Sequence, residues 1–375
     1  MILINVFSVW MEFPNMAKLS ELDFTDLYIR IDGIDGSRYS PVPRRGAPQY
    51  QNLAVPDAFE DDINVVREML KSHKKNDISL EYGDMRLRAS ITNTSGDEIW
   101  AALRRLSRTP PALEELNFRP EILQEFRAMG RRSGLIIVGG ATRAGKTTTM
   151  MGLLCDFMRV YGGVAVSIED PEEYALRGQH GDYGYCIQKA VDKDEEWGEA
   201  LKTFLRWAPR YIALGEIRAP SAAKWLLRAA TSGHLALCTV HGGSVEETLS
   251  AVLQMARTEL GDTAQNILAD GICAIIHQSI SNGRPNVQIL TTENIVSDPV
   301  RVSIRSNKLQ MLGTYIEQQS AARNREARNN AEKGLTGGKS APTRQIPGGQ
   351  PPTKAPPTTK TAAPTKKGFF SWLRR

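Results

Sequence analysis

A glycine-rich turn between an apolar run and an amphipathic run constrains the fold of this chain more than any other feature. Residues 135–138 are four consecutive apolar residues, which predict a buried strand. They are followed by Gly140-Ala-Thr-Arg-Ala-Gly-Lys146-Thr, which matches the G-x-x-x-x-G-K-[ST] pattern of phosphate-binding loops. After Lys146, large apolar residues recur at helical spacing. The sequence therefore predicts a strand, a phosphate-binding turn and a helix in succession.

The residue types in this turn suit the binding of ATP and Mg²⁺. Glycines let successive backbone N–H groups curve around phosphate oxygens, and the helix N-terminus adds a favourable dipole. We expect Lys146 to reach the β- and γ-phosphates and the Thr147 hydroxyl to hold Mg²⁺. The alternative is a turn that matches by chance, in roughly one chain in a hundred of this length. The strand before the turn and the helix after it favour nucleotide binding.

The distribution of charge argues against nucleic acid as a sequence-specific partner. The chain of 375 residues has a net charge of +5. Eight basic residues and no acidic ones lie between Thr336 and Arg375, so the remainder has a net charge of −3. The basic character therefore belongs to the tail rather than to a folded surface.

The four cysteines are far apart and form no C-x-x-C pair. Their spacing supports neither a zinc site nor a disulfide framework, and it is typical of reduced thiols in the cytoplasm. The apolar residues 1–11 are too few to span a bilayer and lack the features of a signal peptide, so we expect a core strand there. Met16 is an alternative start of the protein.

Residues 1–108 are predicted to form a small α/β, PAS-like domain. Alternation of apolar and polar residues predicts a strand at 27–31 and a hairpin of two strands at 78–82 and 85–89. One apolar stripe predicts a helix at 55–73. The hairpin places Arg86 and Arg88 on one face. Residues 99–106 fit a strand or a short helix. The prolines after Thr109 mark the domain boundary.

Residues 109–320 alternate apolar strands with amphipathic helices. Buried strands are predicted at 164–168, 211–214 and 235–240. One face of a helix is predicted from apolar residues at helical spacing, which are Trp197, Ala200, Leu201, Phe204 and Leu205. This alternation predicts a parallel sheet that is covered on both faces.

Residues 321–375 are predicted to contain the end of a polar helix and then a disordered segment rich in Pro, Thr and Lys. The chain ends with Phe369, Phe370, Trp372 and Leu373 between basic pairs. This ending could dock on an anionic membrane or in the groove of a partner, and the alternative is an unstructured terminus that binds nothing.

Acidic and histidine residues follow or precede the predicted strands. Glu169-Asp-Pro-Glu-Glu-Tyr174 follows one strand, and Gly215-Glu216-Ile-Arg218 follows the next. His234 precedes a third strand and His241 ends it. Each could be a turn, a solvated strand end or a structural histidine, but three such sites after one phosphate loop favour a shared catalytic role at the carboxyl ends of the strands.

These motifs, in this order, resemble the acidic box, the second nucleotide motif and the histidine box of the PilT-like secretion and pilus ATPases. The resemblance covers residues 27–318. It implies a RecA-like ATPase domain and a homo-hexamer in which hydrolysis rocks the N-terminal domain. It also implies a cytoplasmic protein that is peripheral to the inner membrane and acts on inner-membrane components of a transfer machine.

The resemblance also implies roles for single residues. Glu169 would orient the attacking water, Glu216 would help to hold Mg²⁺ and water, and His234 and His241 would sense the nucleotide. Arg88 and Arg104 match the arginine strands of the family, whose guanidinium groups reach the γ-phosphate. With the catalytic Lys146, the expected nucleotide-binding residues are Gly140, Ala141, Thr142, Arg143, Ala144, Gly145, Lys146, Thr147, Thr148, Arg88, Arg104, Arg218, His234 and His241.

Several positions depart from the family pattern. Arg143 and Ala144 stand where the family usually has Gly-Ser, and Ala219 stands where an Asp is usual. The pilus-retraction signature is only partly matched by residues 299–306, and the four-cysteine zinc site is absent. The remaining pattern is most similar to the DotB and TraJ branch, which implies a motor of type IVB secretion or plasmid conjugation. Alternatives are a pilus motor, a non-hydrolysing nucleotide-gated scaffold and a DNA motor whose basic tail grips the strand.

Overall fold

The computed structural model describes residues 18–33, 36–42, 51–73, 76–191, 193–281 and 284–336, with side chains up to residue 329. The strand predicted within residues 1–11 and the tail predicted after residue 336 lie outside these ranges. The chain divides into two compact units, Met1–Ala327 and Arg328–Arg375. In the second unit, the structure describes only the end of a helix. No helix in the described ranges is both long and apolar enough to span a membrane.

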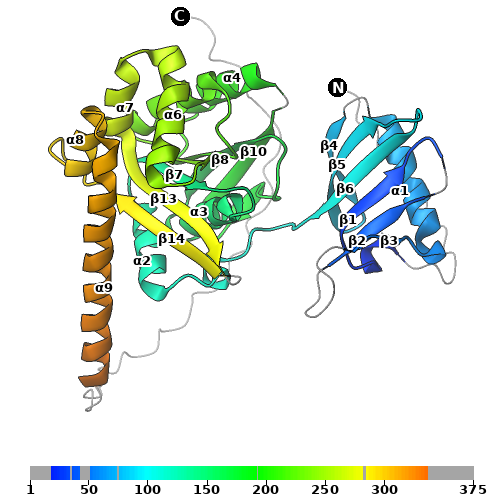
Figure 1. The fold of residues 1–375 in the computed structure, drawn as a ribbon, viewed down its shortest axis with the longest axis horizontal. Coiled ribbons are helices and arrows are strands. Elements are labelled where there is room, and N and C mark those ends of the chain that lie inside the picture. Colours follow the sequence, from blue (N-terminus) through cyan, green and yellow to red (C-terminus); the bar gives the residue numbers. More distant parts are fainter. Residues whose placement is uncertain are drawn as a thin grey trace, which may run out of the picture. The chain divides into compact units, whose positions relative to one another are not determined.

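The N-terminal part of the first unit is an antiparallel sheet with one long helix against it (Figure 1). The strand order is β3-β2-β1-β6-β5-β4. The strands are β1 (Phe24–Arg30), β2 (Arg38–Pro41), β3 (Leu53–Ala54), β4 (Asp77–Tyr82), β5 (Met85–Asn93) and β6 (Ile99–Leu106). The helix is α1 (Glu60–Ser72), and short 3₁₀ helices are η1 (Leu19–Glu21) and η2 (Asp57–Phe59).

Alternation of apolar residues explains this part of the fold. Ile63, Val66 and Leu70 of α1 are fully buried against strand residues such as Leu27 and Leu87. Residues 99–106, which the sequence left open between strand and helix, form β6 because they pair on both sides with β1 and β5. Strands β2 and β3 were not predicted, since they are short and none of their residues is buried.

The larger sheet of the first unit has eight strands in the order β14-β13-β7-β12-β11-β8-β10-β9. The strands are β7 (Gly134–Gly140), β8 (Gly163–Glu169), β9 (Gly178–His180), β10 (Gly184–Ala190), β11 (Tyr211–Leu214), β12 (Leu235–His241), β13 (Ile272–Ser281) and β14 (Arg284–Thr291). The six strands from β13 to β10 are parallel, as the sequence predicts.

Helices cover both faces of this sheet (Figure 1). The helices are α2 (Pro120–Met129), α3 (Lys146–Tyr161), α4 (Asp194–Leu205), α5 (Pro220–Thr231), α6 (Val245–Leu260), α7 (Thr263–Gly271), α8 (Pro299–Arg305) and α9 (Leu312–Thr336), with 3₁₀ helices η3 (Leu113–Leu116) and η4 (Leu309–Met311). On β7, Ile136 and Val138 pack in the cluster of α2 and α3, whereas Leu135 and Ile137 pack in the cluster of α4–α9. Adjacent residues therefore serve opposite layers, which explains why the strand is apolar throughout.

The outermost strands depart from the predicted parallel pattern. Strands β9 and β14 are antiparallel to their neighbours β10 and β13. The burial of both strands is only partial, so they lack the continuous apolar run that marks the central strands.

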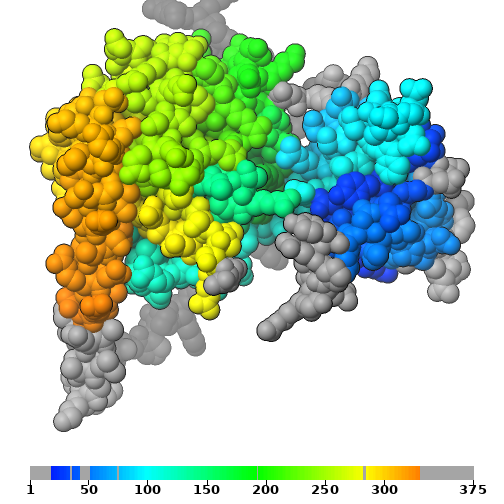
Figure 2. Space-filling view, in the orientation of Figure 1, coloured from blue at the N-terminus to red at the C-terminus, as the bar shows by residue number. Residues whose placement is uncertain are grey.

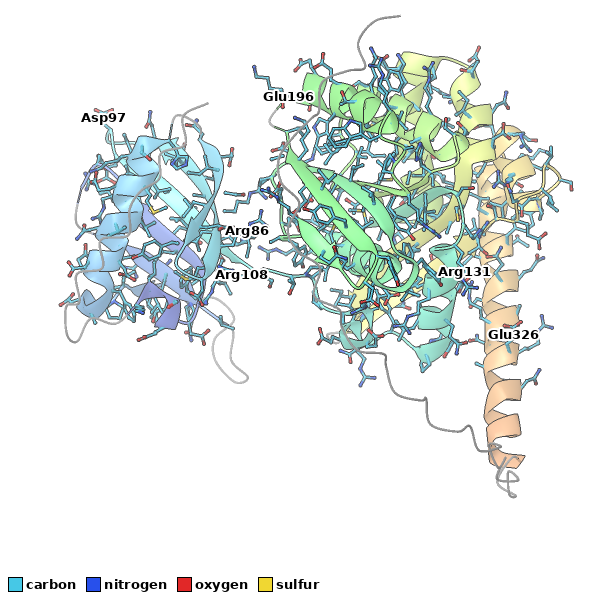
Figure 3. All side chains as sticks on the ribbon, turned by 180° about the vertical axis from the view of Figure 1, so that it is seen from behind. Arg86, Asp97, Arg108, Arg131, Glu196 and Glu326 are labelled. Carbon is cyan, nitrogen blue, oxygen red and sulfur yellow. The ribbon has the colours of Figure 1, made fainter. Side chains whose placement is uncertain are left out.

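The end of the polar helix that the sequence predicts after residue 320 belongs to α9. Arg323 pairs with Glu125 of α2 at 3.0 Å and donates to the Ile289 carbonyl of β14 at 2.9 Å. Gln319 accepts from the Thr291 backbone N–H at 2.9 Å, so the orange helix lies beside the yellow strand in Figure 2. Glu326, one turn after Arg323 in α9, projects from the helix in Figure 3. The buried residues Leu312 and Ile316 join the start of this helix to the core, and polar contacts attach the part that follows.

Candidate active site

The loops that carry the predicted motifs follow neighbouring parallel strands. In the register of the sheet, His241 is paired with Gly140, and Leu214 is paired with Ile168. The segments after β7, β8, β11 and β12 therefore leave the sheet at the same edge, where ligands bind in open parallel sheets. They enclose a pocket lined by Arg88, Thr142, Arg143, Lys146, Thr147, Glu169, Asp170, Pro171, Glu173, Trp197, Gly215, Glu216, Arg218, Thr239 and His241.

The phosphate loop between β7 and α3 depends on positive φ angles. Gly140 has φ 152° and Gly145 has φ 79°, which glycine adopts without strain. Arg143 has φ 64°, a left-handed conformation that is uncommon for a residue with a Cβ. The Lys146 ammonium is largely buried and donates to the Ala141 carbonyl at 2.9 Å. The side chain of Lys146 thus forms a hydrogen bond with the backbone of its own loop.

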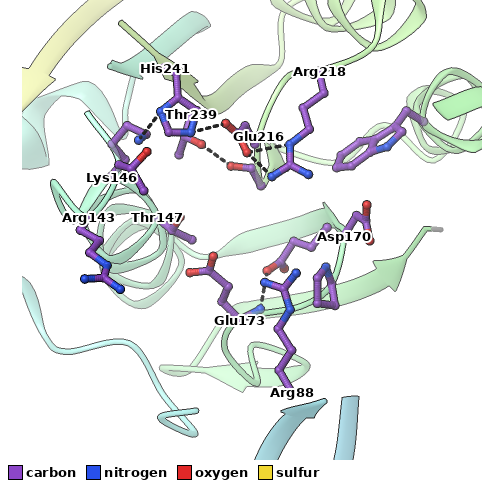
Figure 4. Close-up of a pocket in the computed structure, with 15 residues that line it drawn as sticks. Arg88, Arg143, Lys146, Thr147, Asp170, Glu173, Glu216, Arg218, Thr239 and His241 are labelled. Carbon is purple, nitrogen blue, oxygen red and sulfur yellow. Dashed lines mark hydrogen bonds and ion pairs between the residues drawn. The ribbon is translucent and has the colours of Figure 1, made fainter. Parts of the chain in front are cut away.

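Lys146, His241 and Glu216 form a chain of contacts along one side of the pocket (Figure 4). Lys146 Nζ lies 3.4 Å from His241 Nδ1, and His241 Nε2 lies 2.9 Å from Glu216 Oε1. Burial lowers the pKa of Lys146, and the negative charges of Glu216 and Glu173 oppose that shift. A phosphate in this pocket would favour the charged lysine in the same way.

Arg218 and the Glu216 carboxylate form an ion pair on the same side. Arg218 contacts Glu216 Oε2 through both Nε, at 2.8 Å, and Nη2, at 2.5 Å. The arginine side chain is 61% exposed, so the pair is largely solvated and contributes little to stability. Its guanidinium therefore remains available to an anionic ligand.

Glu169 ends β8 and is the most deeply buried carboxylate of the pocket. It accepts from the Ser167 hydroxyl at 2.6 Å, from Gln188 Nε2 at 3.0 Å and from the Glu173 backbone N–H at 3.2 Å. Burial raises the pKa of Glu169, and these three donors lower it in part. A carboxylate with a raised pKa is suited to accept a proton near neutral pH.

Glu173 is a pocket residue that sequence reasoning did not single out. The Thr147 hydroxyl and the Arg88 guanidinium both lie close enough to Glu173 to interact with its carboxylate. Burial raises the pKa of Glu173, whereas Arg88, Thr147 and Lys146 lower it. The sequence signal that could have identified Glu173 is its place in the same acidic box, four residues after Glu169. The turn that brings Glu173 back to the phosphate loop has no pattern that can be recognised in the sequence.

The predicted residues that do not line this pocket are five residues at or next to its loop, together with Arg104 and His234; the five are Gly140, Ala141, Ala144, Gly145 and Thr148. Arg104 pairs with Asp26 at 2.8 Å and lines a second hollow, which contains Arg105 and Arg108 and shares Arg143 with this pocket. The His234 ring lies 2.6 Å from the Pro209 carbonyl and precedes β12, whereas His241 ends that strand. His234 is therefore at the opposite edge of the sheet, because residues 235–241 cross it. Thr148 faces Tyr174, with 2.8 Å between their hydroxyl oxygens.

The oxygen donors beside the loop fit Mg²⁺. The Thr147 hydroxyl and the carboxylates of Glu173 and Glu216 are hard oxygen ligands, and Mg²⁺ typically takes one or two carboxylates together with substrate phosphates. Among the described residues, no group of three or more His, Cys, Asp or Glu is arranged to hold a metal without such a substrate. These donors therefore suit a metal that arrives with its nucleotide.

A central parallel sheet, a phosphate loop that ends at a helix N-terminus, and carboxylates at the neighbouring strand ends together define a P-loop nucleotide-binding domain. Residues 66–332 match the family model of the type II/IV secretion system proteins. The chain belongs to this family. The resemblance to the PilT-like secretion and pilus ATPases is confirmed, and with it the RecA-like fold and the enzyme class, an ATPase.

Individual relatives agree with this assignment. The chain is 29% identical to the type IV pilus ATPase PilU of Pseudomonas aeruginosa over 307 residues, which are 78% of this chain and 77% of that protein. The structure of the pilus retraction motor PilT with bound ADP matches with a TM-score of 0.62 and 24% identity, covering 80% of this chain and 87% of the other. The ATPase DotB of Legionella pneumophila matches with a TM-score of 0.57 and 18% identity, covering 79% and 85%.

Proposed function

We propose that this protein is a hexameric motor that hydrolyses ATP at the cytoplasmic face of the inner membrane and drives a type IVB secretion or conjugal transfer system. The observation that carries the catalytic part is the pocket in which Lys146, Glu216 and Glu169 converge from three strand ends. The transfer system is inferred from the motif departures described above, and the fold likeness to DotB agrees with it.

The pocket suggests a division of labour among these residues. Lys146 and the backbone N–H groups of the loop hold the phosphates, and Thr147 and Glu216 would hold Mg²⁺, which neutralises charge on the phosphates when bound. Glu169 accepts a proton from water that attacks the γ-phosphate. Arg88 and Arg218 offer guanidinium groups to the transferred phosphoryl. We assign His241 the role of a nucleotide sensor, because it contacts both Lys146 and Glu216.

Arg104 and His234 require a different account. Neither lies in the pocket of this subunit, so a contact with nucleotide would have to be made across a ring. The Arg104 side chain is 57% exposed and pairs with the partly exposed Asp26, so much of it is accessible to a neighbouring copy. We propose this role for Arg104 and no nucleotide contact for His234.

Two measurements test the motor. Phosphate release should require Mg²⁺ and should rise faster than linearly with protein concentration as rings form. Electron microscopy of the same samples should show six-fold rings. A protein that binds ATP but releases no phosphate at ring-forming concentrations would instead be a nucleotide-gated scaffold.

A pilus retraction or assembly motor is the second candidate. It is favoured by the relatives, since PilU matches over 78% of this chain. Expression of the chain in a strain that lacks its own pilus motor distinguishes the candidates. Restored twitching would support the pilus function, and restored DNA or protein transfer in a strain that lacks its transfer ATPase would support the type IVB function.

The tail is proposed to attach the ring to an anionic membrane or to a partner through Phe369, Phe370, Trp372 and Leu373, on the basis of sequence alone. The full chain should float with vesicles that contain anionic lipid, and replacement of these four residues by Ser should abolish flotation. Equal flotation of both proteins would contradict the membrane contact.

A further inference from the structure

A buried glutamine lies directly beneath the phosphate loop. Strand β13 runs parallel to β7, and their pairing ends at His277 and Gly139, so Gln278 stands where the loop leaves the sheet. Its side chain is 3% exposed. Gln278 Nε2 donates to the Ala144 carbonyl at 2.6 Å, and Gln278 Oε1 accepts from the Thr149 hydroxyl at 2.8 Å. One side chain thus joins the loop to the first turn of α3.

The contact with Ala144 fixes a peptide plane. The C=O of one residue and the N–H of the next point in opposite directions across a planar trans peptide. When Gln278 holds the Ala144 carbonyl, the Gly145 N–H is directed away from Gln278. Backbone N–H groups of a phosphate loop bind phosphate only when they converge on the same concavity. Gln278 therefore helps to set the direction of one of these donors.

Close packing prevents the loop from relaxing around this anchor. A Cβ on Gly140 would lie 2.3 Å from the Gln278 carbonyl oxygen, and a Cβ on Gly145 would lie 2.9 Å from Gln278 Nε2. Both glycines also have positive φ angles. Gly140 and Gly145 are therefore required for two reasons. A larger side chain at either position would collide with Gln278, and the backbone conformation at both favours glycine.

An amide is the side chain that satisfies both partners. The Ala144 carbonyl needs a donor, and the Thr149 hydroxyl donates to an acceptor. Glutamine supplies both groups, a carboxylate supplies only the acceptor, and leucine supplies neither. An unsatisfied carbonyl in this buried place would cost free energy and would be free to rotate the peptide.

We infer that Gln278 is a positioning residue that holds the phosphate loop in its binding shape before the nucleotide arrives. It acts through the Ala144–Gly145 peptide and the Thr149 hydroxyl, and it is not among the described residues that line the pocket. A loop that is preorganised in this way binds phosphate without first paying the entropy of ordering. The inference requires nucleotide binding at this loop but not any particular transfer system.

The test compares Gln278→Leu with Gln288→Leu in the full-length protein. Gln288 lies on β14 opposite His277 and is exposed, so it provides the same chemical change outside the loop. Titration with a fluorescent ADP analogue should show binding weakened about tenfold or more in Gln278→Leu and unchanged in Gln288→Leu. Competition by adenosine, which has no phosphates, should be equal in all three proteins.

A second variant separates positioning from packing. In Gln278→Glu, the introduced carboxyl can donate to Ala144 only when it is protonated, so the ADP affinity of this variant relative to wild type should rise as the pH is lowered. Wild-type ADP affinity in Gln278→Leu, an equal loss of adenosine affinity, or a Gln278→Glu ratio that does not change with pH would each overturn the inference. Failure of the wild type to bind ADP would instead contradict the nucleotide site itself.

Discussion

His241 Nε2 donates a hydrogen bond to Glu216 Oε1 across 2.9 Å. The direction follows from the partner on the other ring nitrogen, because the Lys146 ammonium, 3.4 Å from Nδ1, can only donate. The proton of the neutral imidazole is therefore assigned to Nε2. The residue that anchors phosphate and the residue assigned to the metal are thus connected through a single side chain, so a ligand that draws Lys146 away also changes the environment of Glu216.

This connection predicts the effect of removing the imidazole. His241→Ala should lower the turnover number about tenfold or more while the affinity for ADP changes less, because the phosphate loop remains intact. Steady-state phosphate release and ADP titration measure the two quantities. His234→Ala is the matched control, since His234 lies at the far edge of the sheet, and it should retain near wild-type turnover. Equal losses in both variants would contradict the sensor role of His241.

Glu169 and Glu173, two of the three glutamates of the acidic box, should differ in their effects. Glu169→Gln should keep ATP binding and lower turnover by about two to four orders of magnitude, as expected when a general base is removed. Glu173→Gln should also affect the dependence of turnover on Mg²⁺ concentration, because Glu173 contacts Thr147. Rapid-quench assays at several Mg²⁺ concentrations distinguish them. Normal hydrolysis by Glu169→Gln would show that the base is elsewhere.

Burial of Glu173 predicts a pH dependence of stability. Burial raises the pKa of this carboxyl in the folded protein above its ordinary value of 4.5, so the native state binds its proton more tightly than the unfolded state does. The folded state is therefore favoured as pH falls and loses stability as pH rises from 4.5 through the folded pKa. Glu173→Gln removes this loss. Urea unfolding without nucleotide at pH 5 and pH 8 should show a gain in stability for the variant that is larger at pH 8.

Arg143 combines an uncommon backbone conformation with an added charge. Arg143→Gly should unfold with a free energy about 1 kcal/mol higher than Arg143→Ala, because only glycine relieves the left-handed φ of 64°. Both variants remove the guanidinium, so both should weaken ATP binding by a similar factor and should reduce its dependence on salt. Chemical denaturation measures the first effect, and titrations at two ionic strengths measure the second. If the two variants unfold with equal free energies, the positive φ angle at position 143 does not strain the loop.

Much of the central fold could be predicted from local patterns. The strands β7, β8, β11 and β12 are buried on both faces and are therefore continuous apolar runs, and the loop after β7 carries its own chemical pattern. Because these strands are parallel, the residues at their ends had to meet, which explains the convergence of Lys146, Glu169 and Glu216.

Other features depend on tertiary contacts that leave no local signal. Strands β9 and β14 are only partly buried, so pairing with a neighbour, and not an apolar run, defines them. Gln278 is distant from the loop in sequence, and only the position of β13 beside β7 brings it there. Arg104 fits the family pattern, yet the pairing of β6 with β1 places it beside Asp26.

The most direct measurement of the central claim is a cryo-EM or crystal structure of the protein with Mg²⁺ and a non-hydrolysable ATP analogue. The account predicts the terminal phosphate between Lys146 and the two glutamates Glu169 and Glu216, with the Gly145 N–H directed at a phosphate oxygen. An analogue bound away from the loop, or a terminal phosphate that neither glutamate approaches, would contradict it.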